Sequence, residues 1–388
     1  MKIFLDIIVL LLSLSVLVCL HELGHLLVAK AFKVYCAEYS IGMGPLLFKV
    51  KKPGQETQFS IRMLPIGGYV AMAGEGSEEI EEFKDVPQER FLTGVARWKR
   101  ALIMVAGVTV NFILALLLFM GSGLASPILD ENKRTMIVHE NTTTPYLAET
   151  AGLTNDDNIK NIKFVFTRNG EEEVVEKKVE DGRDLYTAAN LFNITDSGYY
   201  GSELSKPLSM NDTWRWVLTT DTDKVISFNV TPVEVKIKNP VDPDELVLTW
   251  DTTKIGIDFH TRQRNFNEAM NRAGDEFITS VTSFSVLFQE GGWKNLGGVI
   301  SVFQVSSMAT DVGFYYYLYV WGFISLNLAI VNLLPFPGLD GWHLVVCAFE
   351  GLFRRDMPAK AKQVMSTIGM VLLFGLMIFV TVLDLLRL

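Results

Sequence analysis

Charged residues are scarce in this chain of 388 residues, because Asp, Glu, Lys and Arg together make up only 20% of it. A soluble globular protein usually carries about 25%. Hydrophobic residues account for 49%, and they gather in a few long runs instead of being spread evenly. The scarcity of charge therefore argues against an ordinary soluble protein and directs attention to the apolar runs.

Cysteine is also scarce, with three residues at positions 19, 36 and 347. The polar stretch between residues 130 and 259 has none, so nothing indicates a disulfide framework there. No two cysteines have C-x-x-C spacing, and we interpret all three as small buried apolar residues. The net charge of −9 argues against nucleic acid as a partner.

Four apolar runs are long enough to cross a hydrocarbon layer, which takes roughly 20 residues. They cover residues 3–29, 101–124, 314–334 and 368–386. The first run has the alternative interpretation of a cleaved signal peptide. However, it continues well past a signal-peptide core, and no small-residue cleavage site follows. We therefore predict a polytopic α-helical membrane protein with four transmembrane helices.

Basic residues predict the orientation, because cytosolic loops carry an excess of Lys and Arg. They concentrate between the first two runs, where Arg97-Trp98-Lys99-Arg100 forms a basic and aromatic collar, and again between the last two runs. Both segments are predicted to be cytosolic. Residues 126–312 and both termini would then lie outside the cytosol.

The sequence His21-Glu22-Leu23-Gly24-His25 fits the H-E-x-x-H pattern. Helix residues four apart share one face, so both imidazoles can reach one metal ion while the glutamate holds a metal-bound water. Zinc suits such ligands and lowers the pKa of bound water to about 7. Glu22 would accept the proton of that water and pass it to the leaving amine. Soluble proteins contain this pattern by chance, but here it lies in an apolar span, where ionisable groups are costly.

Two histidines leave zinc short of a third protein ligand. Asp340 is the ionisable residue nearest the end of the third run, in the segment Asn332-Leu333-Leu334-Pro335-Phe336-Pro337-Gly338-Leu339-Asp340-Gly341. Its prolines would break the helix and let the carboxylate turn inward. The segment could equally be a plain cytosolic turn, and the residues alone leave both interpretations open. His343 lies close by, but three protein ligands already suffice.

Between the first two runs, residues 46–51 and 59–63 alternate like strands around a turn at residues 52–55, which predicts a β-hairpin at the membrane face. Residues 130–259 are polar, have strand-like alternation and suffice for one soluble domain, with a helix expected near residues 185–192. Residues 266–308 have an amphipathic helical pattern and are expected to lie along the membrane.

These motifs together resemble the site-2 protease family of membrane-embedded zinc metalloproteases, in particular the bacterial branch that includes the regulator of sigma-E protease. Its members pair H-E-x-x-H on the first span with N-x-x-P-x-P-x-L-D-G on the third, and both motifs occur here in that order. Residues 39–45, 64–75 and 324–329 are also similar to the family. The resemblance implies zinc bound by His21, His25 and Asp340, Glu22 as catalytic base, and Asn332 in contact with substrate.

Two positions depart from the family pattern, although neither touches a proposed ligand. Trp342 stands where many relatives have glycine, and Val108 where relatives often carry proline, whereas Gly107 and Asn111 are kept.

The outer domain resembles a single PDZ domain. Ala151-Gly152-Leu153 followed by Asp157-Asn158-Ile159 is close to the signature A-G-L-x-x-G-D-x-I, with Asp156 in place of the second glycine. Asp tolerates positive φ better than most residues, so the turn can survive. Residues 193–215 are expected to be an insertion. Whether the domain captures peptides or screens bulky substrates as a spacer stays open.

The predicted function is hydrolysis of peptide bonds in or near transmembrane segments of single-span proteins, such as anti-sigma factors or remnant signal peptides. The expected location is a bacterial plasma membrane, with the active site toward the cytosol. One alternative is a membrane adaptor that has lost catalysis and binds peptides through its PDZ-like domain. The intact set of four site residues argues against it. A zinc-binding transporter is disfavoured because the chain has only four spans and one metal site and the sequence shows no paired half-repeats.

The predicted segments follow the chain in order: helix 1 (1–29), hairpin region (30–97), helix 2 (98–125), PDZ-like domain (130–259), connector (260–312), helix 3 (313–341), and cytosolic connector with helix 4 (342–388).

Overall fold

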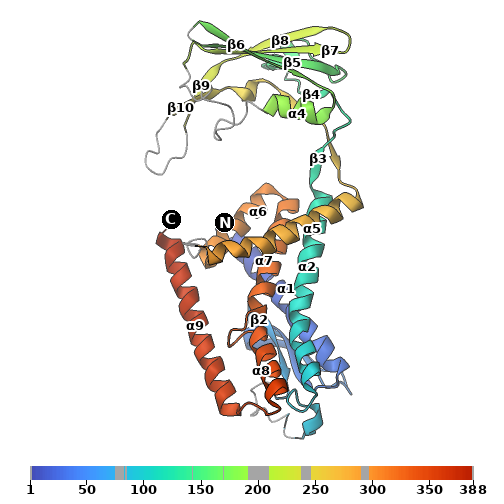
Figure 1. Cartoon of the computed structure of the whole chain (residues 1–388), viewed down its shortest axis with the longest axis vertical. Helices are drawn as coiled ribbons and strands as arrows, with labels where there is room; N and C mark the ends of the chain where they lie inside the picture. Colours follow the sequence, from blue (N-terminus) through green and yellow to red (C-terminus); the bar gives the residue numbers. More distant parts are fainter. Residues whose placement is uncertain are drawn as a thin grey trace. The chain divides into compact units, whose positions relative to one another are not determined.

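The computed structural model describes residues 2–74, 83, 85–141, 143–168, 170–190, 209–236, 246–289 and 297–386. The chain divides into two compact units (Figure 1). The helical unit comprises residues 1–126 and 264–388, and the sheet unit comprises residues 127–263.

Four helices of the helical unit are long and apolar enough to cross a membrane. They are α1 (Lys2–Ala31), α2 (Arg97–Ala125), α7 (Phe314–Leu333) and α9 (Ala359–Leu386). Each coincides with one of the predicted apolar runs, although α9 begins earlier than its run, just after Pro358. Large hydrophobic side chains are exposed along these helices, as expected where lipid is the solvent. The prediction of a polytopic membrane protein is confirmed.

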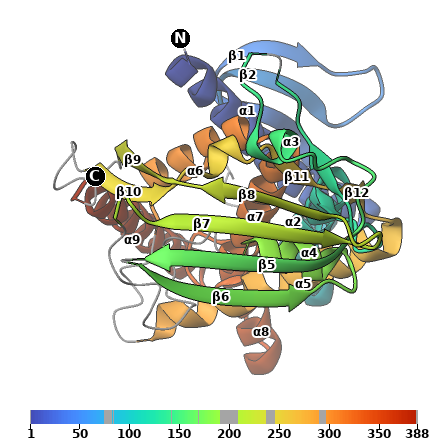
Figure 2. The same cartoon turned by 90° about the horizontal axis from the view of Figure 1, so that it is seen from above.

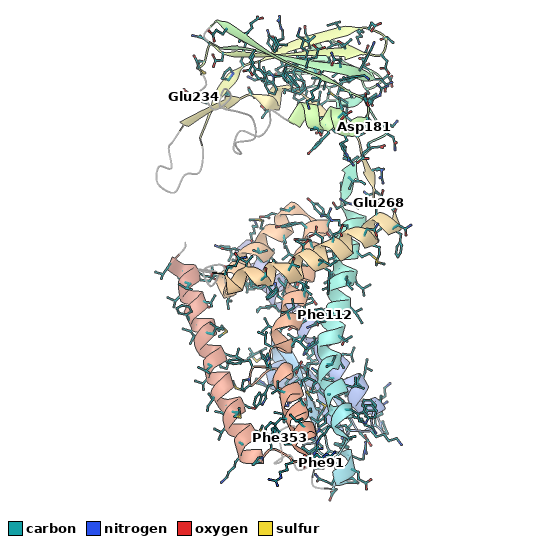
Figure 3. All side chains as sticks on the ribbon, viewed as in Figure 1. Phe91, Phe112, Asp181, Glu234, Glu268 and Phe353 are labelled. Atoms are coloured by element: carbon teal, nitrogen blue, oxygen red, sulfur yellow. The ribbon has the colours of Figure 1, made fainter. Side chains whose placement is uncertain are left out.

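Helix α2 is the centre of the helical unit, because it packs against α1, α5 (Phe266–Ser283), α7 and α8 (Asp340–Phe353). Small residues allow α1 and α2 to pack closely against each other. A Cβ on Gly24 would lie 2.7 Å from the Ala106 carbonyl oxygen of α2. Phe112, labelled in Figure 3, packs against Phe277 of α5 with ring centroids 5.8 Å apart.

The predicted amphipathic connector forms two helices, α5 and α6 (Val299–Val312), with the short 3₁₀ helix η4 (Phe284–Phe288) after α5. Asn265 and Glu268 cap the start of α5 reciprocally. Figure 1 shows α5 lying across the ends of α2 and α7. Residues 290–296 of the predicted connector lie outside the described residues.

The predicted hairpin is present as two long antiparallel strands, β1 (Cys36–Val50) and β2 (Gln58–Met72). Both strands are longer than the sequence pattern indicates, because register shifts carry the pairing through Gly42, Gly44 and Gly67, all with positive φ. Next to the turn, large apolar side chains are exposed, among them Leu47, Phe48 and Met63.

The sheet unit is built on a four-stranded antiparallel sheet in the order β6-β5-β7-β8, which Figure 2 shows side by side. The strands are β5 (Ile159–Arg168), β6 (Glu171–Lys178), β7 (Thr213–Thr220) and β8 (Val225–Val230). Inward residues alternate along β5 and β7, so Phe164, Phe166, Trp214 and Trp216 form an aromatic core.

Shorter elements complete the sheet unit. These are β3 (Pro127–Leu129), β4 (Met136–Val138), α3 (Leu147–Thr150), α4 (Gly182–Asn190), β9 (Pro232–Lys236), β10 (Leu246–Trp250), the 3₁₀ helix η3 (Thr252–Lys254), β11 (Ile257–Phe259) and β12 (Thr261–Gln263). The helix expected near residues 185–192 is α4, of which residues 191–192 lie outside the described part. Residues 193–208 of the expected insertion also lie outside it, and residues 213–215 belong to β7.

A buried carboxylate ties α8 to two of the long helices. Glu350 is fully buried, and its oxygens lie 2.9 Å from Arg100 Nη2 of α2 and 2.6 Å from Lys362 Nζ of α9. The backbone N–H of Met357 donates to it as well. Burial raises the pKa of Glu350, but these hydrogen bonds and the two positive charges outweigh burial and lower it below the usual range.

We expect Glu350→Gln to lower the free energy of unfolding by about 3–5 kcal/mol, because it leaves the buried Arg100 and the partly buried Lys362 without a charge partner. The exposed pair of Arg97 and Asp356 is the matched control, and Arg97→Ala should cost less than about 1 kcal/mol. Since the folded-state pKa of Glu350 is depressed, its contribution is complete above about pH 4.3 and is lost as pH falls further. Unfolding in detergent, measured against temperature and pH, checks both variants, and equal losses would contradict the prediction.

Candidate metal centre

Three predicted ligands come together at one point of the helical unit. His21 and His25 lie one turn apart on the same face of α1, and both are buried. Their Nε2 atoms are 3.1 Å apart, and they lie 3.0 Å and 3.3 Å from Asp340 Oδ2. Among the described residues, this is the one group of three or more His, Cys, Asp or Glu side chains close enough to hold a metal ion. His343 is not part of it.

The chain path after α7 explains how Asp340 reaches the histidines. Helix α7 ends at Leu333, and the prolines that follow cannot continue it. Gly338 has a φ of +102°, and Leu339 is the N-cap of α8, so Asp340 is the first residue of the new helix. A Cβ on Gly341 would lie 2.3 Å from the carbonyl oxygens of Leu333 and Leu334, so the turn is tight. The segment is therefore a turn, and that turn also carries a carboxylate toward the histidines.

Helix α2 orients both imidazoles. His25 Nδ1 lies 2.8 Å from the Ile103 carbonyl oxygen and donates its proton there, which leaves Nε2 unprotonated. His21 Nδ1 lies 3.2 Å from the Asn111 amide. Asn111 Oδ1 is buried without a hydrogen-bond partner in the described chain. If this oxygen faces Nδ1, it accepts the imidazole proton and frees His21 Nε2 in the same way.

The arrangement of the three ligand atoms suits coordination of a metal ion better than hydrogen bonding among the side chains. Asp340 Oδ2 is buried and accepts no hydrogen bond of good geometry, although both imidazole nitrogens are near. Ligands bonded to a tetrahedral zinc at about 2.0–2.1 Å lie about 3.3 Å apart, which matches the observed spacing. Gly107 keeps the centre open, because a Cβ at this position would lie 2.3 Å from His25 Nε2.

Two further predicted residues border this centre. The Glu22 carboxylate lies near the Val70 backbone of β2 and within electrostatic reach of both histidines and Asp340. Asn332, near the end of α7, places its amide nitrogen 3.5 Å from His21 Nε2. All five predicted site residues therefore surround one point, between α1, the α7–α8 turn and strand β2.

Sequence reasoning missed the role of α2 in this centre. The family pattern marks Gly107 and Asn111 as kept positions but assigns them no task. The Ile103 carbonyl oxygen gives no signal at all, because it belongs to the backbone.

Comparison with known proteins identifies the family of the chain. The sequence model of Peptidase family M50 matches residues 9–376. A candidate zinc metalloprotease of Clostridium perfringens is 30% identical over 393 residues, which cover 96% of this chain and 96% of the relative. Zinc metalloprotease RasP of Shouchella clausii is 24% identical over 445 residues, covering 95% of each chain. A candidate zinc metalloprotease of Campylobacter jejuni is 28% identical over 381 residues, covering 97% of this chain and 92% of the relative.

A helical membrane unit with a buried pair of histidines and a carboxylate defines the class of intramembrane metalloproteases. The chain belongs to Peptidase family M50. It is a multi-pass membrane protein and a zinc metalloendopeptidase, as the resemblance to site-2 proteases predicts.

Proposed function

We propose that His21, His25 and Asp340 hold the zinc ion and that Glu22 is the general base of peptide hydrolysis. The observation that carries this proposal is the convergence, within 3.3 Å, of two imidazole nitrogens from a helix apolar enough to span a membrane and one carboxylate oxygen from the start of α8. Three protein ligands leave the fourth tetrahedral position for water, as a catalytic zinc requires.

Each residue of the centre has a distinct task in the reaction. Bound zinc supplies a Lewis acid and lowers the pKa of water toward neutrality. Glu22 accepts the proton of the attacking water and passes it to the leaving amine. Asn332 is the substrate contact, because its amide can donate a hydrogen bond to a peptide carbonyl beside His21.

Strand β2 is the proposed docking edge for an extended substrate. A helical substrate satisfies its backbone groups internally, so it must unwind before water can attack. An open strand edge beside Glu22 can supply replacement hydrogen bonds. The exposed apolar side chains near the β1–β2 turn support a membrane-associated hairpin, because in water such a surface would be costly.

The sheet unit is proposed to be a PDZ-like domain outside the cytosol. Within its signature, Gly152 has a φ of +80°, and Asp157 Oδ2 accepts 2.9 Å hydrogen bonds from the N–H and hydroxyl of Thr154. Lys224 bonds both Asp157 and the Gly152 carbonyl oxygen, so the turn holds with Asp156 in place of glycine. Peptide capture and steric screening of bulky substrates remain its two candidate roles.

The basic segments between the first two and the last two apolar runs support an active site toward the cytosol. The single outer domain, which has no cysteine, supports a bacterial plasma membrane as the location. The proposed substrates are single-span proteins, with anti-sigma factors and remnant signal peptides as the two classes. The seven segments predicted from the sequence, from helix 1 to helix 4, are part of the proposed organisation of the protein in this membrane.

Substitution of Asp340 tests the ligand set. We expect Asp340→Asn to lower the zinc content of the purified protein well below one per chain and to abolish cleavage, because a neutral amide is a much weaker zinc ligand. Asp356→Asn, an exposed neighbour between α8 and α9, should keep both properties. Zinc would be measured by elemental analysis and cleavage with a tagged single-span substrate in membranes. Full zinc content in Asp340→Asn would exclude Asp340 as a ligand.

A further inference from the structure

A cavity of about 880 Å³ opens where α1 ends and α2 begins, away from the metal centre. Its wall includes Lys30 and Lys33 at the end of α1 and Lys99 in the first turn of α2. The turn of the β1–β2 hairpin, at residues 54–56, closes another side. The cavity therefore joins the ends of two membrane-crossing helices to the hairpin.

The charge of this cavity is positive, although the whole chain carries a net charge of −9. Arg90 binds Glu56 with two hydrogen bonds of 2.6 and 2.7 Å, so this carboxylate is already neutralised. Lys30 and Lys33 are exposed. Lys30 lies close enough to Glu56 to help Arg90 lower the pKa of that carboxylate, and no salt bridge to either lysine is found in the described part of the chain. An anion in the cavity would meet three ammonium groups, and Glu89 is the one lining carboxylate that pairs with no cation among the described residues.

Aromatic side chains beside the cavity indicate its level in the membrane. Trp98 is 60% exposed and meets Phe32 edge to face at 5.4 Å. The Lys99 ammonium lies 5.5 Å from the Phe32 ring centre and 5.6 Å from that of Trp98. Exposed tryptophan and basic residues at the end of a span are typical of the headgroup region. The cavity thus lies where lipid phosphates are found.

We propose that this cavity binds the phosphate of an anionic phospholipid headgroup. Its volume falls in the range of small-molecule sites, about 300–1,000 Å³. Basic pockets at the membrane surface recognise such headgroups through their negative charge. A bound phosphate would link Lys30 to the hairpin turn, little more than one helical turn beyond His25. The proposal requires that the end of α1 and the start of α2 lie in the headgroup region of the membrane. It does not require that the protein be catalytically active.

The test compares two double variants of the full-length protein in a neutral detergent. Lys30→Gln with Lys33→Gln removes two cavity cations, and Lys49→Gln with Lys52→Gln removes two exposed lysines of the same region that do not line the cavity. Native mass spectrometry would measure binding of dioleoylphosphatidylglycerol against dioleoylphosphatidylcholine, with glycerol 1-phosphate as the soluble competitor.

We expect the unaltered protein and the Lys49/Lys52 variant to retain phosphatidylglycerol in preference to phosphatidylcholine. The Lys30/Lys33 variant should bind it about 30-fold more weakly while keeping its lipid-free unfolding temperature. Equal weakening in both variants, or no preference for phosphatidylglycerol, would overturn the proposal. Displacement by glycerol 1-phosphate at equal concentration would assign the site to a soluble phosphate and overturn the lipid assignment.

Discussion

Glu22→Gln should lower the rate of substrate cleavage in membranes by about 10²- to 10⁴-fold while leaving the zinc content unchanged. The amide keeps the size of the carboxylate, so the packing of α1 and the contact with β2 are preserved. It cannot accept the proton of the attacking water at neutral pH, and that proton transfer is the task we assign to Glu22. The Michaelis constant should change little, because the variant leaves the proposed substrate contacts, the strand edge and Asn332, unchanged.

The comparison needs two readouts, since loss of activity alone does not separate a base from a ligand. Glu173→Gln on the exposed strand β6 removes a carboxylate outside the helical unit and should cleave at the normal rate. If Glu22→Gln loses zinc together with activity, Glu22 acts as a ligand and the proposed division of tasks is wrong. If it cleaves normally, the general base is another group.

The long helices could be predicted from the sequence because a bilayer imposes a simple rule on them. Any run of about 20 apolar residues must satisfy its backbone internally, and a helix does so without partners. The H-E-x-x-H spacing likewise needs only the geometry of one helix. The pairing of α1 with Asp340 is different, because it joins residues more than 300 positions apart.

The remaining features depended on long-range contacts and on the backbone. The residues around Asp340 predict a turn, but they do not show that the turn brings the carboxylate to the histidines of α1, because that depends on how α1, α7 and α8 pack. In the sheet unit, β5 pairs with β7 across a long connection, so the strand order does not follow from alternation. The support that Ile103 gives to His25 comes from a carbonyl oxygen, which has no sequence signature. The metal ligands themselves stay a prediction.

The metal centre also depends on Gly107 of α2 having no side chain. Its missing side chain leaves room for the two imidazoles, since a Cβ would lie 2.3 Å from His25 Nε2 and 2.9 Å from His21 Cε1. His25 cannot easily move away, because its Nδ1 is bonded to Ile103 on the same helix as Gly107. A larger α1–α2 distance would give up the close packing of Gly24 against the Ala106 backbone, so separation of the helices would also cost stability. We therefore expect Gly107→Ala to lower zinc affinity by on the order of 100-fold or more and to abolish cleavage.

Gly375→Ala on α9 is the matched control, because a Cβ there meets no atom within 4 Å. It should retain zinc and activity and gain roughly 0.5–1 kcal/mol of stability, as alanine does over glycine inside a helix. Zinc affinity would be measured by competition with a chelator, and unfolding temperature would show whether each variant is folded. A folded Gly107→Ala protein with normal zinc affinity would mean that α1 and α2 lie farther apart at the metal centre. The Ile103 and Asn111 contacts would then lose their assigned role in orienting the histidines.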